Sequence, residues 1–101
     1  MIKKIDLANQ HLQTILTILD SNLPNHAKVW LFGSRATGKA KPFSDVDLLI
    51  DLNAPAPLSL LAKLSTAFEE SKLPFKVDIA DASVISKEFK HNIKDQLISL
   101  R

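Results

Sequence analysis

The sequence predicts an α+β fold in which a mixed three-stranded sheet is flanked by helices. Segments with apolar residues at helical spacing alternate with short apolar runs of strand length. Their order along the chain is α-β-α-β-α-β-α, and a polar stretch at residues 33–47 joins the first two strands. The length of 101 residues and the hydrophobic content of 46% are typical of one globular domain, which we expect to span residues 1–101.

The first helix and the first strand lie before Gly33. Asp6 is a good N-cap residue, and the helix is expected to end near residues 20–22, before Pro24 turns the chain. Its apolar face consists of Ala8, Leu12, Ile15, Leu16 and Leu19. The apolar run at residues 29–32 then predicts a short buried strand over residues 28–32.

The second strand is predicted at residues 46–52. Residues 34–39 have room for a helical turn, but the residue before Pro42 avoids the α region, so no long helix fits there. Along the strand, successive side chains point to opposite faces of the sheet. One face carries Val46, Leu48, Ile50 and Leu52, and the other carries Asp45, Asp47, Leu49 and Asp51.

A third helix, a third strand and a last helix complete the chain. Pro57 suits the first turn of a helix that runs to about Ser71, with Leu60, Leu61, Leu64, Ala67 and Phe68 on its apolar face. Residues 75–80 alternate between apolar and polar and predict a strand in which Asp78 has apolar neighbours. Residues 86–100 predict a helix with Ser86 as its N-cap and Phe89, Ile93, Leu97 and Leu100 as its buried stripe.

The polar stretch at residues 33–47 combines two chemistries. Gly33 and Ser34 can bring backbone N–H groups and a hydroxyl close to an anion such as phosphate, because glycine has no Cβ. Asp45 and Asp47 lie two residues apart at the mouth of a strand, so both carboxylates are on one face, about 6–7 Å apart at Cα. Such a pair suits Mg²⁺, which takes one or two carboxylates together with substrate phosphates.

The expected topology brings these groups together. If Gly33 at the end of the first strand shares a site with Asp47 at the start of the second, the two strands are antiparallel. The helix at residues 57–71 is long enough as a crossover for the third strand to lie parallel to the second. Asp78 then lies beside Asp45 and Asp47, and a cluster of three like charges favours bound cations.

Composition excludes several classes of protein. The sequence has no cysteine, no apolar run of membrane-span length and no basic-then-apolar leader, which indicates a cytoplasmic protein without a membrane partner. The formal charge of +2 is small and the lysines are scattered, so nucleic-acid binding gains no support. The three histidines have no convincing ligand spacing and are interpreted as surface or packing residues. Asp51 and Asp81 are interpreted as solvated or capping groups, and Trp30 and Phe32 as core.

A phosphate-binding loop of the P-loop type is a rival interpretation of the same stretch. Gly33, Gly38 and Lys39 have the spacing of its start, and Asp51 follows an apolar run as a Walker-B aspartate does. However, Ala40 stands where that motif needs Ser or Thr for Mg²⁺, and Pro42 obstructs the helix that should hold the phosphates. We therefore reject this interpretation.

Taken together, these motifs resemble those of the polymerase-beta-like nucleotidyltransferase superfamily. The resemblance rests on Gly33-Ser34, on Asp45-x-Asp47 after ten intervening residues, and on Asp78 on a later strand. The short length and the Gly-Ser-Arg at residues 33–35 look most like its minimal nucleotidyltransferase (MNT) branch. The predicted order of elements also fits the nucleotidyltransferase fold, so the resemblance covers nearly the whole chain.

The resemblance implies a reaction and a role for each matching residue. A nucleoside monophosphate, AMP if the substrate is ATP, passes from a nucleoside triphosphate to an acceptor hydroxyl and pyrophosphate is released. Gly33 and Ser34 hold the triphosphate, and Asp45 and Asp47 bind two Mg²⁺ ions. Asp78 binds the catalytic metal and helps to deprotonate the acceptor. From their positions, Arg35, Lys39 and Lys41 are expected to neutralise phosphate charge.

The resemblance also implies a partner. MNT proteins are often paired with a HEPN-domain toxin, and the nucleotidyltransferase acts as antitoxin by modifying a tyrosine of the toxin with AMP. A domain of this size has room for a triphosphate but little for an acceptor pocket, so a partner chain or an oligomer is expected to present the acceptor. Two alternatives stay open: a module with weak or absent catalysis that neutralises its partner by contact, and a nucleotidyltransferase that modifies small molecules such as antibiotics.

Overall fold

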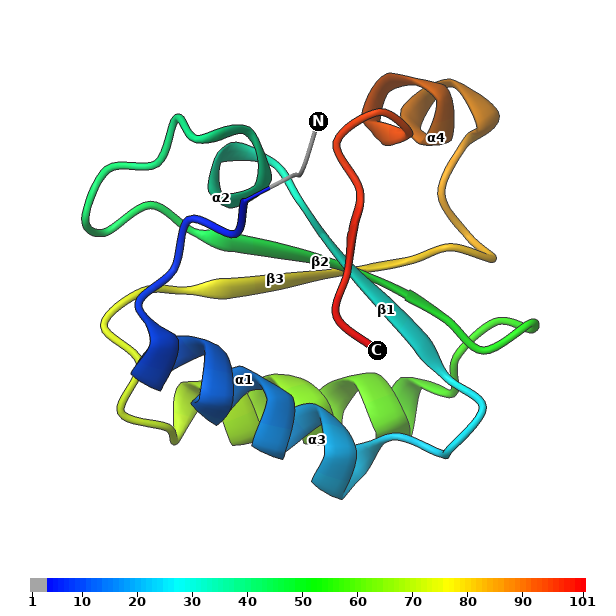
Figure 1. The fold of residues 1–101 in the computed structure, drawn as a ribbon. Coiled ribbons are helices and arrows are strands. Elements are labelled where there is room, and N and C mark those ends of the chain that lie inside the picture. Colours follow the sequence, from blue (N-terminus) through cyan, green and yellow to red (C-terminus); the bar gives the residue numbers. More distant parts are fainter. Residues whose placement is uncertain (1–3) are drawn as a thin grey trace.

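A computed structural model of the protein describes residues 4–101. Four helices and four strands alternate along these residues (Figure 1). The helices are α1 (Asn9–Asn22), α2 (Ser34–Thr37), α3 (Leu58–Glu69) and α4 (Lys87–Ile93). The strands are β1 (Lys28–Phe32), β2 (Val46–Asp51), β3 (Val77–Asp81) and β4 (Ile98–Ser99). None of the helices in this part of the chain is both long and apolar enough to cross a membrane.

The strands form one mixed sheet in the order β3-β2-β1-β4. β1 and β2 are antiparallel, and β2 and β3 are parallel, as the sequence predicts. The predicted strand number is wrong, because β4 pairs with the other edge of β1 through Leu31 and Ile98. The segment that we expected to continue the last helix to residue 100 leaves it after Ile93. Pairing with β1 supplies partners for backbone groups that an edge strand would leave unpaired.

α1 and α3 lie side by side on one face of the sheet (Figure 1). Between these helices and the sheet lies the main hydrophobic core, to which β2 contributes Val46, Leu48 and Ile50. The other members of this core are Ile15, Leu19, Leu23, Ala27, Val29, Leu31, Leu64 and Phe68. The predicted alternation along β2 is thus confirmed on its apolar face.

The opposite face of the sheet is covered by α4 (Figure 1). Phe32 and Leu49 from the strands pack there against Ala82 and Ile93, and Trp30 packs against the same cluster. Because side chains alternate along β2, Asp47 points to this second face together with Leu49. The second face therefore combines a small apolar cluster with the predicted site residues.

Several predicted boundaries move by a few residues. Asp6 is not the N-cap of α1, which begins at Asn9 after Ala8; the Asp6 backbone N–H instead donates to the Arg35 carbonyl at 2.8 Å. Pro57 precedes α3 as its N-cap residue, where its missing N–H costs nothing. Ser86 caps α4 as predicted, since its Oγ accepts from the Phe89 N–H at 3.1 Å.

Candidate functional site

The site begins with the sharp turn at Gly33, which connects β1 to the four-residue helix α2. Gly33 has φ 77° and ψ −155°, a combination that is essentially restricted to glycine. Its carbonyl accepts from the N–H groups of Ala36 at 3.0 Å and Thr37 at 3.1 Å and so starts α2. The turn thus lets the chain leave the sheet and enter a helix within one residue.

Asp47 lies directly against this turn. It stands opposite Phe32 in the antiparallel pairing of β1 and β2, so its side chain emerges beside Gly33. A Cβ placed on Gly33 would overlap Oδ2 of Asp47 and would lie 3.2 Å from its Cγ. The glycine is therefore required both by its backbone angles and by the carboxylate packed on it, and the two ends of the polar stretch meet as predicted.

Asp78 and Asp45 lie close enough to Asp47 to change its acidity. Asp78 is the neighbour of Asp47 in the parallel pairing of β2 and β3, and Asp45 precedes β2. The pKa of Asp47 is raised, first by burial, which disfavours the charged form, and then by repulsion from Asp78 and from Asp45. Of the three carboxylates predicted to share a site, Asp45 and Asp78 thus both raise the pKa of Asp47.

The acidic cluster is looser than the sequence predicts. Among residues 4–101, no three Asp, Glu or His side chains are placed so that they could hold a metal ion by themselves. Asp78 forms an ion pair with Lys76 at 3.5 Å, and the two side chains are 45% and 75% exposed. The expectation of three carboxylates facing one spot needs this correction: any bound ion would need further oxygens from a substrate.

Arg35 does not serve the role expected of it. The residue is 6% exposed, and its guanidinium donates to the carbonyls of Asp6, Pro42 and Ser44 at 2.9–3.3 Å. It also lies over the Phe75 ring, 4.8 Å from the centroid. With its donors used in this way, Arg35 is not free to bind phosphate; it fixes the loop that carries Pro42 and Ser44.

The remaining predicted residues lie on α2 and on this loop. Ser34 opens α2 and is half-buried, and its carbonyl accepts from the Lys39 N–H at 3.1 Å. Lys39 and Lys41 are exposed, and the backbone N–H of Lys41 donates to Ser44 Oγ at 2.8 Å. The two lysines are thus accessible on a loop that is held at both ends.

Two other acidic residues are capping groups, as interpreted from the sequence. Asp81 is 8% exposed, and its carboxylate accepts from the N–H groups of Ala56 at 2.8 Å and Ser83 at 2.9 Å. Asp51 accepts from the Asn53 N–H at 2.8 Å. Neither contributes to the cluster around Asp47.

One residue of the site was missed from the sequence. The Gly33 N–H donates to Oε1 of Gln96 at 2.9 Å, although 63 residues separate the two. Gln96 belongs to a segment that we expected to be helical, and a lone glutamine has no motif that would single it out. Only the pairing of β4 with β1 brings it to the turn.

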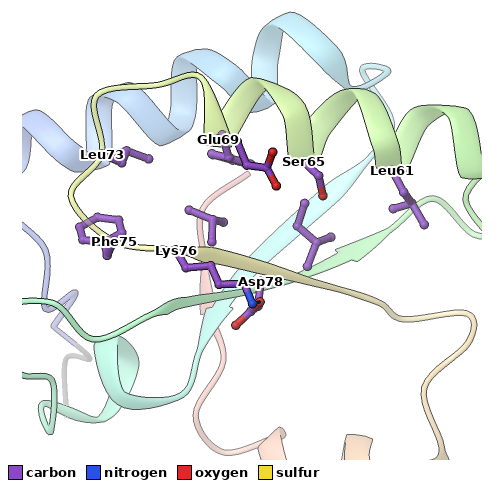
Figure 2. A pocket seen from close by; sticks show the side chains of 10 residues that line it. Leu61, Ser65, Glu69, Leu73, Phe75, Lys76 and Asp78 are labelled. Carbon is purple, nitrogen blue, oxygen red and sulfur yellow. Dashed lines mark ion pairs between the residues drawn. The ribbon is translucent and has the colours of Figure 1, made fainter.

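A pocket of about 510 Å³ opens between α3 and the edge strand β3. Figure 2 shows Ser65 and Glu69 on the helix side and Lys76 and Asp78, which form the ion pair described above, on the strand side. Apolar side chains line the rest: Leu61, Phe68, Leu73, Phe75, Val77 and Ile79. Asp78 therefore belongs both to the surroundings of Asp47 and to the lining of this pocket.

The geometry agrees with comparisons to known proteins. A family model described as a nucleotidyltransferase domain matches residues 12–101. The chain belongs to the nucleotidyltransferase domain family. A Haemophilus influenzae protein described as probable protein adenylyltransferase MntA is 38% identical over 91 residues, which are 90% of this chain and 79% of that protein.

Solved structures share the fold of this chain. A crystal structure of a toxin–antitoxin with AMP-PNP superimposes with a TM-score of 0.74 at 23% identity, over 89% of this chain and 72% of that one. The MNT antitoxin in complex with the tri-AMPylated HEPN toxin of Shewanella oneidensis superimposes with a TM-score of 0.62 at 21% identity, over 91% and 70% of the two chains. The predicted nucleotidyltransferase fold is confirmed, with its fourth strand added.

Proposed function

We propose that this nucleotidyltransferase is a protein adenylyltransferase and antitoxin that transfers AMP from ATP to a hydroxyl of a HEPN toxin, a tyrosine side chain. The observation that carries the proposal is the closure of the Gly33 turn on the carboxylate of Asp47. It places an anion-accepting corner beside an acidic group, as transfer of a phosphate-linked group requires. The descriptions of the Haemophilus relative and of the AMPylated toxin complex support the choice of AMP and of the partner.

The nucleotide is held at the Gly33 corner. Ser34 offers its hydroxyl and its backbone N–H to the triphosphate, and Gly33 lets the phosphate approach the main chain. Lys39 and Lys41, exposed on the loop that Arg35 fixes, neutralise phosphate charge. Arg35 takes no part in binding, and residues 1–101 act as one catalytic domain in this proposal.

The donor set fits Mg²⁺. This ion is bound by one or two carboxylates and by substrate phosphates more often than by a complete protein cage, and the looseness of the acidic cluster is what such sharing requires. The raised pKa of Asp47 also favours a bound cation, because a cation would remove the repulsion from Asp45 and Asp78. Asp45, Asp47 and Asp78 would hold one or two such ions, which would supply positive charge to the attacking and leaving oxygens.

The transfer step needs a base and an acceptor. Asp78 accepts the proton of the tyrosine hydroxyl, whose oxygen forms a bond to the α-phosphorus while the bond to the pyrophosphate oxygen breaks and pyrophosphate leaves. Lys76, whose Nζ lies 3.5 Å from Oδ1 of Asp78, adds a positive charge beside this carboxylate. Asp78 neighbours Asp47 in the pairing of β2 and β3, and its carboxylate lies on the side of β3 away from α3 (Figure 2), so the partner presents its tyrosine from that side.

One experiment tests the proposal directly. The protein is incubated with labelled ATP, Mg²⁺ and the HEPN protein encoded beside it, and AMP on the toxin is measured by mass spectrometry. Transfer that disappears in Asp47→Asn supports catalysis. Neutralisation of the toxin that persists in Asp47→Asn without any AMP transfer supports instead a module that acts by contact, a candidate that the incomplete metal cage keeps open.

A further inference from the structure

The contact between Gln96 and Gly33 joins the C-terminal segment to the corner that holds the nucleotide. Oε1 of Gln96 accepts from the Gly33 N–H at 2.9 Å, and both residues are half-buried. We propose that Gln96 is a positioning residue of the transfer site, which acts through Gly33 on the placement of Asp47. This inference rests on the function proposed above.

The backbone on both sides of Gln96 is fixed. Its own N–H donates to the Ile93 carbonyl at 2.9 Å, at the end of α4. Two residues further along, Ile98 pairs with Leu31 of β1 in the antiparallel ladder. The side chain of Gln96 therefore starts from a point that is held from two directions, so the contact with Gly33 costs little additional ordering.

The contact acts where the main chain is least constrained. Glycine has no side chain to limit its rotation, and the peptide between Phe32 and Gly33 follows the last residue of β1. The hydrogen bond that the Gly33 N–H donates to Gln96 holds this peptide in one orientation, and that orientation keeps the Gly33 Cα against the carboxylate of Asp47. Without it, the turn and the carboxylate shift relative to each other, and a displacement of about 1 Å costs up to about 100-fold in rate.

The acceptor is also neutral, which suits its surroundings. Asp47 already lies within the influence of Asp45 and Asp78, and a triphosphate at the Gly33 corner adds more negative charge. An amide oxygen supplies the acceptor that Gly33 needs without a further charge. A glutamate at the same position would keep the hydrogen bond but repel the nucleotide.

Two variants and a control test the proposal. Gln96→Leu removes the acceptor at similar volume, Gln96→Glu keeps an acceptor and adds charge, and Ser99→Ala changes an exposed side chain of the same segment. AMP transfer to the HEPN partner gives kcat and the KM for ATP, binding of Mg²⁺ with AMP-PNP is measured by calorimetry, and hydrogen exchange of the Gly33 amide is followed by NMR.

The two Gln96 variants are expected to differ in kind. Gln96→Leu lowers kcat about 10- to 100-fold and makes the Gly33 amide exchange faster, while KM changes by less than about threefold. Gln96→Glu keeps kcat and the amide protection but raises KM about tenfold, because its charge opposes the triphosphate. Ser99→Ala matches the unchanged protein in all three measurements.

Other outcomes overturn the proposal. A folded Gln96→Leu variant with unchanged kcat overturns it, and so does a Gln96→Glu variant with unchanged KM. If Gln96→Leu fails to fold, the KM of Gln96→Glu alone decides. If the unchanged protein transfers no AMP, the proposed function fails, and the calorimetry and the Gly33 amide exchange still decide the role of Gln96. In that case, unchanged exchange of the Gly33 amide in the Gln96→Leu variant rejects it, and so does an AMP-PNP affinity of the Gln96→Glu variant equal to that of the unchanged protein.

Discussion

Gly33→Ala is expected to destabilise the protein severely, for two reasons that can be separated. The backbone angles of φ 77° and ψ −155° cost a residue with a Cβ about 1–3 kcal/mol. The new Cβ also overlaps Oδ2 of Asp47, and forcing an extra carbon into a packed position costs a further amount of about 1–3 kcal/mol. The sum of about 2–6 kcal/mol is a large part of the roughly 5–15 kcal/mol that stabilises a small domain.

Gly38→Ala is the matched control for this substitution. Gly38 has nearly the same φ of 76°, but nothing lies within 4 Å of the position where its Cβ would be. It adopts the left-handed helical conformation, in which alanine costs only about 1–2 kcal/mol. At about 4–8 °C per kcal/mol for a domain of this size, thermal unfolding followed by circular dichroism separates the two variants clearly.

The clash with the carboxylate is measured by a double-mutant cycle. Asp47→Ala removes the atoms that the new Cβ would meet, so in its background Gly33→Ala loses the steric part of its cost, about 1–3 kcal/mol. AMP transfer is absent from both single variants and from the double variant. A Gly33→Ala that is no less stable than Gly38→Ala, or a cycle without coupling, would refute the close packing of Gly33 on Asp47.

Three further predictions concern Asp47, Arg35 and Asp81. Asp47→Asn is expected to raise the melting temperature at pH 7, because the folded-state pKa of Asp47 is raised and its ionised form therefore costs stability at neutral pH. This gain in stability fades as pH falls through the folded-state pKa and vanishes below the ordinary value of 3.8. Thermal melts from pH 3 to 8 check the prediction, and a lower melting temperature of the variant at pH 7 contradicts it. Arg35→Lys should lower the free energy of unfolding, measured in urea, by about 2–4 kcal/mol, because an ammonium cannot reach three carbonyls as the guanidinium does. Residues 39–44 should then become accessible to proteases, and an unchanged rate of proteolysis would contradict this. Asp81→Ala should lower the free energy of unfolding by about 2–4 kcal/mol, because two N–H groups lose their acceptor. The kcat measured at low temperature should stay unchanged, and a fall in kcat would instead place Asp81 in the site.

The three strands that build the site could be predicted because local pattern and tertiary demand agree there. Residues 29–32 are apolar throughout and are followed by Gly33, and β2 alternates with a period of two. The C-terminal segment lacks this agreement. Ile93, Leu97 and Leu100 have helical spacing. However, Leu100 forms a hydrogen bond with β1 instead, since its N–H donates to the Val29 carbonyl at 2.9 Å. A pairing partner that is distant in sequence decides the structure, and periodicity cannot reveal it.

The site divides in the same way. Gly33 and Asp47 could be predicted because turn chemistry and strand period are local properties. Arg35 was assigned to the substrate because a cation next to a phosphate corner suits that role, yet its guanidinium turns inward to the carbonyl of Asp6 and to the Phe75 ring, far away in sequence. Gln96 was missed because an uncharged side chain without a motif becomes significant only through the contact that it makes.

The site is thus arranged at the expense of stability. Burial and two neighbouring carboxylates make the ionised Asp47 unfavourable in the folded protein, and Gly33 lies against it in a conformation that only glycine tolerates. Both costs are offset by contacts around these two residues: the Arg35 guanidinium donates to the loop carbonyls, the Gln96 side chain accepts from the turn, and the strand pairing holds the segment of Gln96. Because a bound cation would remove the repulsion around Asp47, binding of Mg²⁺ with ATP should stabilise the folded protein more than the nucleotide alone does. A melting temperature raised equally by ATP with and without Mg²⁺ would argue against Asp45, Asp47 and Asp78 as its ligands.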